Sequence, residues 1–281
     1  NTVNRSVIVA CRYNIRTKTS FYYDFPFQAI SSVGSKICSI DIGILKKVRG
    51  EYSYPMCQDS AFVKNKGQLI IATMNGKVIH KLDYTSLKQD AFGSTRVKNF
   101  KLNHCIFSPS SRFLIFLARG WVKGEKQHVL MCLDCVTNDT YSLVTDNVVS
   151  HYNWLSEDLI VYWGTQGKKR SYHLIDISSL NAVAVHTLSG DFVDDGHPSR
   201  ISESCFVTDT YPDLQRMSSL KKITFDKNFN TNVQVIGRFY QPLKFQGSYR
   251  VDLHPRVEKN GDIYFDSGHS GQRRLYKVKK Y

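Results

Sequence analysis

The sequence has no apolar run of 18 or more residues, and its longest apolar pieces are short segments such as FLIFLA. A helix that crosses a bilayer needs about 20 consecutive apolar residues, so we expect no membrane span. The chain also begins without an initiator Met and without a signal peptide. Processing can remove an address segment, so these two absences constrain the compartment only weakly.

Residues that break regular structure are few, with 7 prolines and 17 glycines among 281 residues. The chain is 42% hydrophobic and 12% aromatic. That composition can bury a core and excludes a disordered chain. Because all-β folds of this length commonly form one unit, we expect a single domain over residues 1–281.

The sequence lacks a cysteine framework. Its seven cysteines form an odd set that lies in strand-like segments instead of framing loops. Free thiols in a reducing compartment have this pattern, so we expect a cytoplasmic protein, with the periplasm as the alternative. The C-x-x-C of MCLDC has no second pair, and in a strand its two thiols would face opposite ways. We therefore interpret Cys132 and Cys135 as small core residues.

Charge of the two signs is unbalanced, because 38 basic against 24 acidic residues give a formal net charge of +14. Such a field attracts nucleic acid, anionic lipid headgroups or acidic polysaccharide. A solubilising lysine-rich surface explains the charge equally well, since the basic residues are spread along the chain. No nucleic-acid-binding motif is present, so nucleic acid is the least favoured partner.

Four segments share one layout, in which a histidine precedes a short strand, a polar turn and a second apolar strand. The histidines are His104, His151, His197 and His254, spaced 47, 46 and 57 residues apart. The turns read SPSSR, LSED, ISES and EKNG, and further strands such as HVLMCLDC and TYSLVT complete each unit. This period predicts four-stranded propeller blades.

The strands are rich in Val, Ile, Tyr and Phe, and no segment of helical length with a 3.6-residue period competes with them. An earlier unit begins at PFQAIS, where Gln28 takes the histidine's place, and contains the long insertion GILKKVRGEYSYPMCQDSAF. The segments SVIVACRYN and SFYYDF look like the last two strands of an incomplete N-terminal blade, and QRRLYKVKKY stops after a third strand. We therefore expect an all-β propeller with five blade starts.

The first strand of each blade lies innermost in a propeller, so residues at its start surround one mouth of the central channel. The four histidines should therefore converge there, with Gln28 as a fifth polar group. A lone blade histidine more often satisfies a backbone group or braces a neighbouring blade. Four in register favour a metal instead, because packed neutral imidazoles would leave buried nitrogens unpaired.

We therefore predict a divalent transition metal, Mn or Zn, on a set of ligands that share these equivalent positions. The set is His104, His151, His197, His254 and Gln28. Three carboxylates close to the histidines in sequence could orient their ring N–H groups, namely Asp195, Asp252 and Asp266.

Other candidates for chemistry lie in the C-terminal third. His269 follows a second strand, so it should sit apart from the other histidines as an independent acid or base, beside Arg250, Arg256 and Arg273. Inter-blade salt bridges explain the arginines at least as well. Tyr211 in TDTYPD could donate a proton or hold a sugar, and a capped turn explains the same letters.

Several of these pieces together resemble the TolB-like and oligogalacturonate-lyase-like bacterial β-propellers. They are DGHPS, TDTYPD, YRVDLHPR, NGDIYFDS and HSGQRRLY, with weaker matches at PFQAIS, RGEYSYP, NHCIFSPS and SHYNW. The resemblance implies a seven-bladed ring in which histidines and a glutamine hold a Mn-type ion and uronate chains are cleaved by β-elimination. It would put His104, His151, His197 and His254, with Gln28, in the metal and base set.

Two functions from different classes follow. The first is a metal-dependent polysaccharide lyase acting on an acidic, uronate-containing oligo- or polysaccharide, with catalytic residues His197, His269, Arg250, Arg273 and Tyr211, and with a glycoside hydrolase as its nearest variant. The second is a non-catalytic propeller that binds an acidic glycan or a protein partner. The sequence leaves both open.

Overall fold

The computed structural model describes residues 2–4, 7–52, 64–145, 148–180, 182–190, 192 and 194–279. The chain divides into two compact units, residues 1–146 and 147–281, which we describe one by one. The expectation of a single domain over 1–281 stays a prediction.

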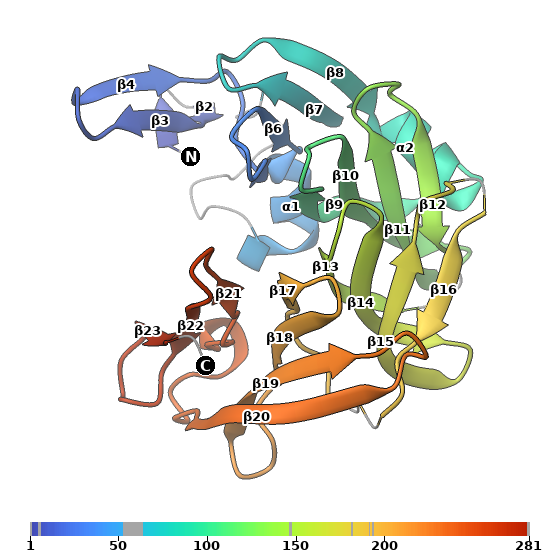
Figure 1. Ribbon diagram of the computed structural model, residues 1–281. Coiled ribbons are helices and arrows are strands. Elements are labelled where there is room, and N and C mark those ends of the chain that lie inside the picture. The colour runs from blue at the N-terminus through green and yellow to red at the C-terminus, as the bar shows by residue number, and fades with distance from the viewer. Residues whose placement is uncertain are drawn as a thin grey trace. The chain divides into compact units, whose positions relative to one another are not determined.

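The first unit contains two antiparallel four-stranded sheets and two hairpins (Figure 1). The hairpins are β1 (Thr2–Asn4) with β2 (Val7–Val9), and β3 (Cys11–Asn14) with β4 (Thr19–Tyr22). The first sheet comprises β5 (Ala29–Ile30), β6 (Lys36–Ser39), β7 (Gln68–Thr73) and β8 (Val78–Asp83). The second comprises β9 (Lys98–Phe107), β10 (Phe113–Val122), β11 (Glu125–Asp134) and β12 (Thr140–Val144).

The second unit contains two further four-stranded sheets and one of three strands. They comprise β13 (Val149–Trp154), β14 (Leu159–Gln166), β15 (Lys169–Asp176) and β16 (Ala184–Thr187); β17 (Ser199–Ser202), β18 (Cys205–Asp209), β19 (Met217–Phe225) and β20 (Thr231–Tyr240); and β21 (Arg256–Val257), β22 (Ile263–Ser267) and β23 (Arg274–Val278). Strands pair in chain order within every sheet, as in a propeller blade.

The sheets confirm the all-β propeller and its five blade starts. Within the first unit β5 contacts β9, and within the second β13 contacts β17 and β17 contacts β21. Within each unit the first strands of successive blades therefore lie side by side, as is required if histidines at the starts of these strands are to converge. The N-terminal segment SVIVACRYN is not one strand, because β2 and β3 are separated at Ala10 and belong to different hairpins.

Two short α-helices are present that the sequence interpretation excluded. The first, α1 (Ile42–Val48), lies inside the predicted insertion and begins at Asp41, whose side chain accepts the Ile44 N–H at 2.9 Å. The second, α2 (Tyr84–Phe92), ends at Gly93 with a left-handed φ of 62°. Both are only two or three turns long, too short for a periodicity search to detect. Among the described residues, 3₁₀ turns span Gly50–Tyr52 and Gly247–Tyr249. Residues 53–62 of the insertion lie outside the described part.

Apolar side chains from neighbouring blades form the cores. One cluster joins β6, β7, α1 and α2 to β9, β10 and β11, with Ile71, Leu87 and Phe116 fully buried. In the second unit one cluster joins β14 and β15 to β18, and another joins β18 and β19 to β22. Cys132 and Cys135 are buried free thiols in a core, as expected. No helix in the described part of the chain is long and apolar enough to cross a membrane.

Candidate metal centre

Three of the predicted histidines form a row in the second unit. The ring centroids of His151 and His197 lie 4.1 Å apart, and those of His197 and His254 lie 3.8 Å apart. His151 belongs to β13, and the other two precede β17 and β21 by two residues. The row thus follows the first strands of three successive blades.

Asp209 at the end of β18 holds the centre of this row. Its carboxylate accepts the backbone N–H of His197 at 2.7 Å and that of His254 at 3.0 Å, and it pairs with Nδ1 of His197 at 2.9 Å. The side chain is 1% exposed. One buried carboxylate therefore fixes two histidine backbones and one ring orientation, and leaves Nε2 as the ring nitrogen of His197 that can reach a ligand.

Gly196 makes this close approach possible. A Cβ at position 196 would lie 1.9 Å from the carbonyl oxygen of Asp209 and 2.7 Å from Oγ1 of Thr208. Such distances are sterically forbidden, so only glycine lets the loop before His197 lie against the end of β18. Thr208 is itself fixed by the buried hydroxyl of Tyr172, at 2.6 Å.

A bulge in β13 aims His151 at a second carboxylate. Ser150 and His151 together oppose Trp163 on β14, because the pairing shifts by one residue between Val149 and Tyr152. As a result both side chains reach Asp195: Oγ of Ser150 donates to it at 2.5 Å, and Nδ1 of His151 pairs with it at 2.9 Å. Asp195 thus orients a histidine ring, as the sequence suggested.

The surroundings shift the proton affinities of the row in different directions. Burial lowers the pKa of His151, and the hydrogen bond that its ring donates to the Asp195 carboxylate only partly opposes that effect. Burial acts in the same sense on His197, but the hydrogen bond and charge of Asp209 outweigh it and raise the pKa of His197. Loss of solvent around the ring, and repulsion by His197, lower the pKa of His254. Two imidazoles of the row are therefore neutral at pH 7.

His197, Asp252 and His254 offer donor atoms that all lie within 4.8 Å of one another. Ligand atoms sit about 2.0–2.2 Å from a divalent transition metal, so two of them on one ion are at most about 4.4 Å apart. Side-chain movements of well under about 1 Å would close that difference. Two imidazoles and a carboxylate are donors that Mn²⁺ or Zn²⁺ accepts, so the residues fit the predicted ion.

Tyr211 and Arg250 lie beside the row. The centroid of the Tyr211 ring is 6.1 Å from that of the His197 ring. The guanidinium of Arg250 lies over the Tyr211 ring, 4.5 Å from the centroid of that ring. Arg250 also makes two hydrogen bonds to Asp252, at 2.5 and 2.8 Å. Burial raises the pKa of Tyr211, so its phenol stays protonated through the neutral range.

His104 and Gln28, the other predicted ligands, belong to the first unit. His104 lies in β9 and packs edge-on against Tyr52, with 5.8 Å between centroids. The Gln28 side chain is half-buried, and its backbone N–H donates to Cys38 at 2.8 Å. Their roles as metal ligands stay predictions.

His269 and Arg273 lie apart from the histidine row. His269 is exposed and packs on Tyr276, 4.4 Å between centroids, which agrees with its expected separate location. Arg273 donates to the backbone carbonyls of Tyr249 and Arg250, so it supports the loop that carries Arg250. Their catalytic roles stay predictions.

Arg256 and Asp266 pair with each other at 2.9 Å. Arg256 lies in β21 and Asp266 in β22 of one sheet, so this ion pair lies within a blade and is not the inter-blade salt bridge that the sequence suggested. The suggestion that Asp266 orients a histidine ring does not hold either, because among its described contacts this carboxylate pairs with an arginine.

Sequence reasoning missed Asp209. TDTYPD drew attention as a polar turn, but Asp209 is the last residue of β18 and faces inward. The signal that could have found it is an acidic residue inside an otherwise apolar strand, next to a threonine and opposite DGHP. A buried carboxylate there needs a partner, and the nearest repeat histidine is the obvious one.

No family model and no curated protein matches the sequence. Solved structures do match. An oligogalacturonate lyase in complex with manganese aligns at 16% identity over 96% of this chain and 71% of that one, with a TM-score of 0.62. The oligogalacturonate lyase of Vibrio parahaemolyticus aligns at 12% identity over the same shares, with a TM-score of 0.64. The chain shares the propeller fold of the oligogalacturonate lyases. The resemblance expected from sequence is thereby confirmed for the fold.

Other propellers match as well. TolB from Acinetobacter baumannii aligns at 12% identity over 75% of this chain, with a TM-score of 0.47. The chain spans 46% of the length of that protein. The β-propeller domain of the Trilobed protease from Pyrococcus furiosus aligns at 12% identity over 96% of this chain and 74% of that one, with a TM-score of 0.52. Because lyases and a protease domain share this fold, an activity has to be argued from the site.

Proposed function

We propose that the protein is a metal-dependent polysaccharide lyase that cleaves a uronate-containing glycan by β-elimination at the histidine row. The observation that carries the proposal is the donor set of His197, Asp252 and His254, with donor atoms within 4.8 Å of one another. The shared fold with a manganese-bound oligogalacturonate lyase supports it.

The charge of the site explains why a cation is needed. Asp195, Asp209 and Asp252 surround the row, and Arg250 is already paired with Asp252. Three carboxylates against one guanidinium would repel a uronate. A divalent ion bound here would neutralise this excess of two negative charges, and it would stabilise the negative charge that develops on the uronate carboxylate when its α-proton leaves.

The chain's own residues supply the proton transfers. In the elimination the α-proton leaves C5, the bond from C4 to the glycosidic oxygen breaks, and a C4=C5 double bond forms. The neutral imidazole of His151, which is not part of the metal donor set, accepts the C5 proton, because burial and repulsion by His197 keep it uncharged at pH 7. The protonated phenol of Tyr211 can donate to the departing oxygen, and Arg250, stacked on that ring, adds positive charge for the anionic substrate.

The test combines metal content with product chemistry. Protein reconstituted with Mn²⁺ or Zn²⁺ should hold one ion per chain, and incubation with oligogalacturonate should give the ultraviolet absorbance of an unsaturated uronate. His254→Ala should lose both. The matched control is His186→Ala, because His186 stacks on Phe229 at 4.3 Å in the same unit, away from the row. Absence of stoichiometric metal after reconstitution refutes the proposal. Binding of metal and glycan without cleavage also refutes a lyase, and it would identify the protein as a non-catalytic glycan-binding propeller.

A further inference from the structure

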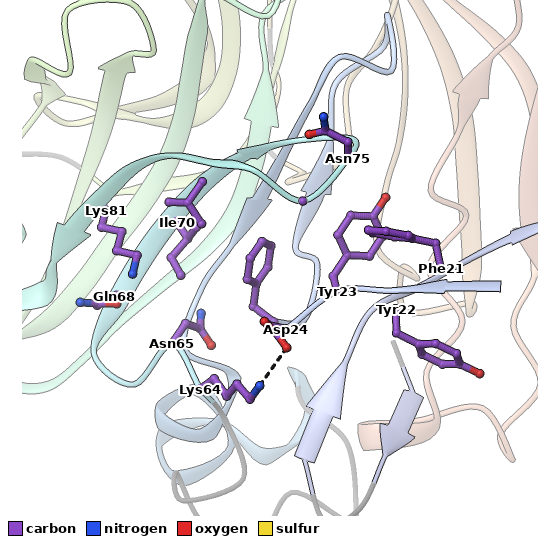
Figure 2. A pocket seen from close by; sticks show the side chains of 13 residues that line it. Phe21, Tyr22, Tyr23, Asp24, Lys64, Asn65, Gln68, Ile70, Asn75 and Lys81 are labelled. Atoms are coloured by element: carbon purple, nitrogen blue, oxygen red, sulfur yellow. Dashed lines mark hydrogen bonds and ion pairs between the residues drawn. The ribbon is translucent and has the colours of Figure 1, made fainter.

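A pocket of about 380 Å³ lies in the first unit between the β3–β4 hairpin and the first four-stranded sheet (Figure 2). Its volume falls in the range of small-molecule sites, about 300–1,000 Å³. All of its lining residues belong to positions 21–81, so it is separate from the histidine row of the second unit.

Aromatic side chains form one wall of this pocket. Phe21 and Tyr22 of β4 are exposed, whereas Tyr23 and Phe25, which also line the pocket, are buried. Phe21 packs edge-on against Tyr23 at 4.8 Å, and the Tyr23 hydroxyl donates to the carbonyl of Met74 at 2.8 Å. The wall is therefore fixed to the β7–β8 turn, with aromatic surface left open to the cavity.

The opposite wall is polar and comes from one face of β7 and β8. Ile70 and Lys81 are directly paired across these strands, so their side chains share a face with Gln68 (Figure 2). Lys64 pairs with Asp24 at 2.8 Å at the bottom of the view. The lining thus has two ammonium groups and one carboxylate, and Lys81 is its one cation without an ion pair among the described residues.

Asn65 is the buried polar residue of the lining. This side chain is 1% exposed, and its Nδ2 donates to Oγ of Ser39 at 3.0 Å. Its Oδ1 is also buried and has no hydrogen-bond partner in the described part of the chain. Asn65 therefore contributes to the shape of the pocket, and the exposed charged group of the polar wall is Lys81.

We propose that this pocket binds one sugar residue of an acidic glycan as a second, non-catalytic subsite. The aromatic wall packs on the apolar face of a pyranose ring, and Lys81 pairs with a single carboxylate. The proposal takes the uronate class of the sugar from the proposed function, whereas the pocket's shape, its aromatic wall and its lysine without an ion pair are independent of that function.

Calorimetric titration with digalacturonate tests the proposal. The protein used is the full chain carrying His254→Ala, in the presence of a chelator, so that the histidine row contributes nothing. One site should titrate, and Phe21→Ala and Lys81→Ala should each weaken binding by about tenfold. Lys77→Ala is the matched control, because Lys77 is an exposed lysine of the adjacent β7–β8 turn that does not line the pocket. It should leave the affinity unchanged.

Absence of binding, or equal effects of Lys77→Ala and Lys81→Ala, overturns the proposal. Equal binding of the neutral disaccharide galactobiose overturns the assignment to acidic sugars. Binding here in a protein that takes up no metal and cleaves no glycan would refute the proposed function while this subsite stands.

Discussion

Asp209→Asn is the substitution that most directly tests how the histidine row is held. Asparagine keeps the shape of aspartate and one acceptor oxygen. That oxygen can remain with the N–H and Nδ1 of His197, but the new amide NH₂ then faces the N–H of His254, which aspartate now accepts at 3.0 Å. Two donors would point at each other in a place where the side chain is 1% exposed.

The size of the effect follows from these contacts. A hydrogen bond to a charged group contributes about 1.5–3 kcal/mol, and a buried donor left unpaired costs about 1–3 kcal/mol. Asp209→Asn loses one such bond, leaves the backbone N–H of His254 without an acceptor and weakens the pairing with His197. We therefore expect the free energy of unfolding to fall by about 3 kcal/mol. Because the ring of His197 is less firmly oriented, metal affinity should fall by about 10–100-fold.

Urea denaturation of the metal-free protein measures the first quantity, and competition with a chelating indicator measures the second. The matched control is Asp226→Asn, because Asp226 also accepts backbone N–H groups, from Asn228 and Asn230, but in an exposed turn. Asp226→Asn should destabilise the protein much less than Asp209→Asn, because water replaces the lost hydrogen bonds in the exposed turn, and it should leave metal binding unchanged. If both variants behave alike, Asp209 does not organise the row and the reasoning is refuted.

Three further perturbations test neighbouring parts of the structure. Gly196→Ala should destabilise the protein in urea by about 1–3 kcal/mol, because its Cβ would meet the carbonyl of Asp209 at 1.9 Å; unchanged stability would contradict the packing. Burial of Asp134 favours its neutral form, but hydrogen bonds from backbone N–H groups and Arg112 prevail and lower its pKa below 3.8. Asp134→Asn should therefore be less stable than the native chain at pH 7, and the gap should close as pH falls through that lowered pKa; a gap that persisted in acid would speak against it. Mn²⁺ at 100 times its Kd should stabilise the native chain by about 2.7 kcal/mol and leave the His254→Ala variant unchanged in thermal melts.

The blades could be predicted from sequence because each repeats one pattern. The segments IYFDS and TYSLVT, for example, correspond to β22 and β12 within a residue, since turn residues bound short runs rich in β-branched and aromatic side chains. Repetition also predicted that His151, His197 and His254 converge. Each comes from the start of a blade, and blade starts are neighbours.

The parts that escaped prediction depend on single contacts instead of a pattern. The helix α2 has weak amphipathicity and is marked mainly by Asp83 before it and Gly93 after it. Asp209 belongs to a strand whose alternation gives no sign that its carboxylate serves histidines from two other segments. Gly196 is required only because of what lies beside it in space. No local spacing encodes such contacts, so a single sequence cannot supply them.

The four repeat histidines share one further property, which is that each stands where the regular β-ladder is interrupted. His104 and Cys105 together oppose Phe116 in a bulge of β9, and Ser150 and His151 oppose Trp163 in a bulge of β13. His197 and His254 precede their strands, and His104 and His254 have left-handed φ angles of 55° and 42°. Left-handed backbone at a non-glycine residue costs about 1–3 kcal/mol and persists only where its surroundings hold it. A bulge re-aims a side chain away from the alternation of its strand, so in β9 and β13 the bulge turns the histidine away from the position that strict alternation would give it. In the second unit the bulge brings His151 into the row with His197 and His254, which come from the loops before their strands. The register visible in the sequence is therefore a register of residues that lie outside the regular β-ladder.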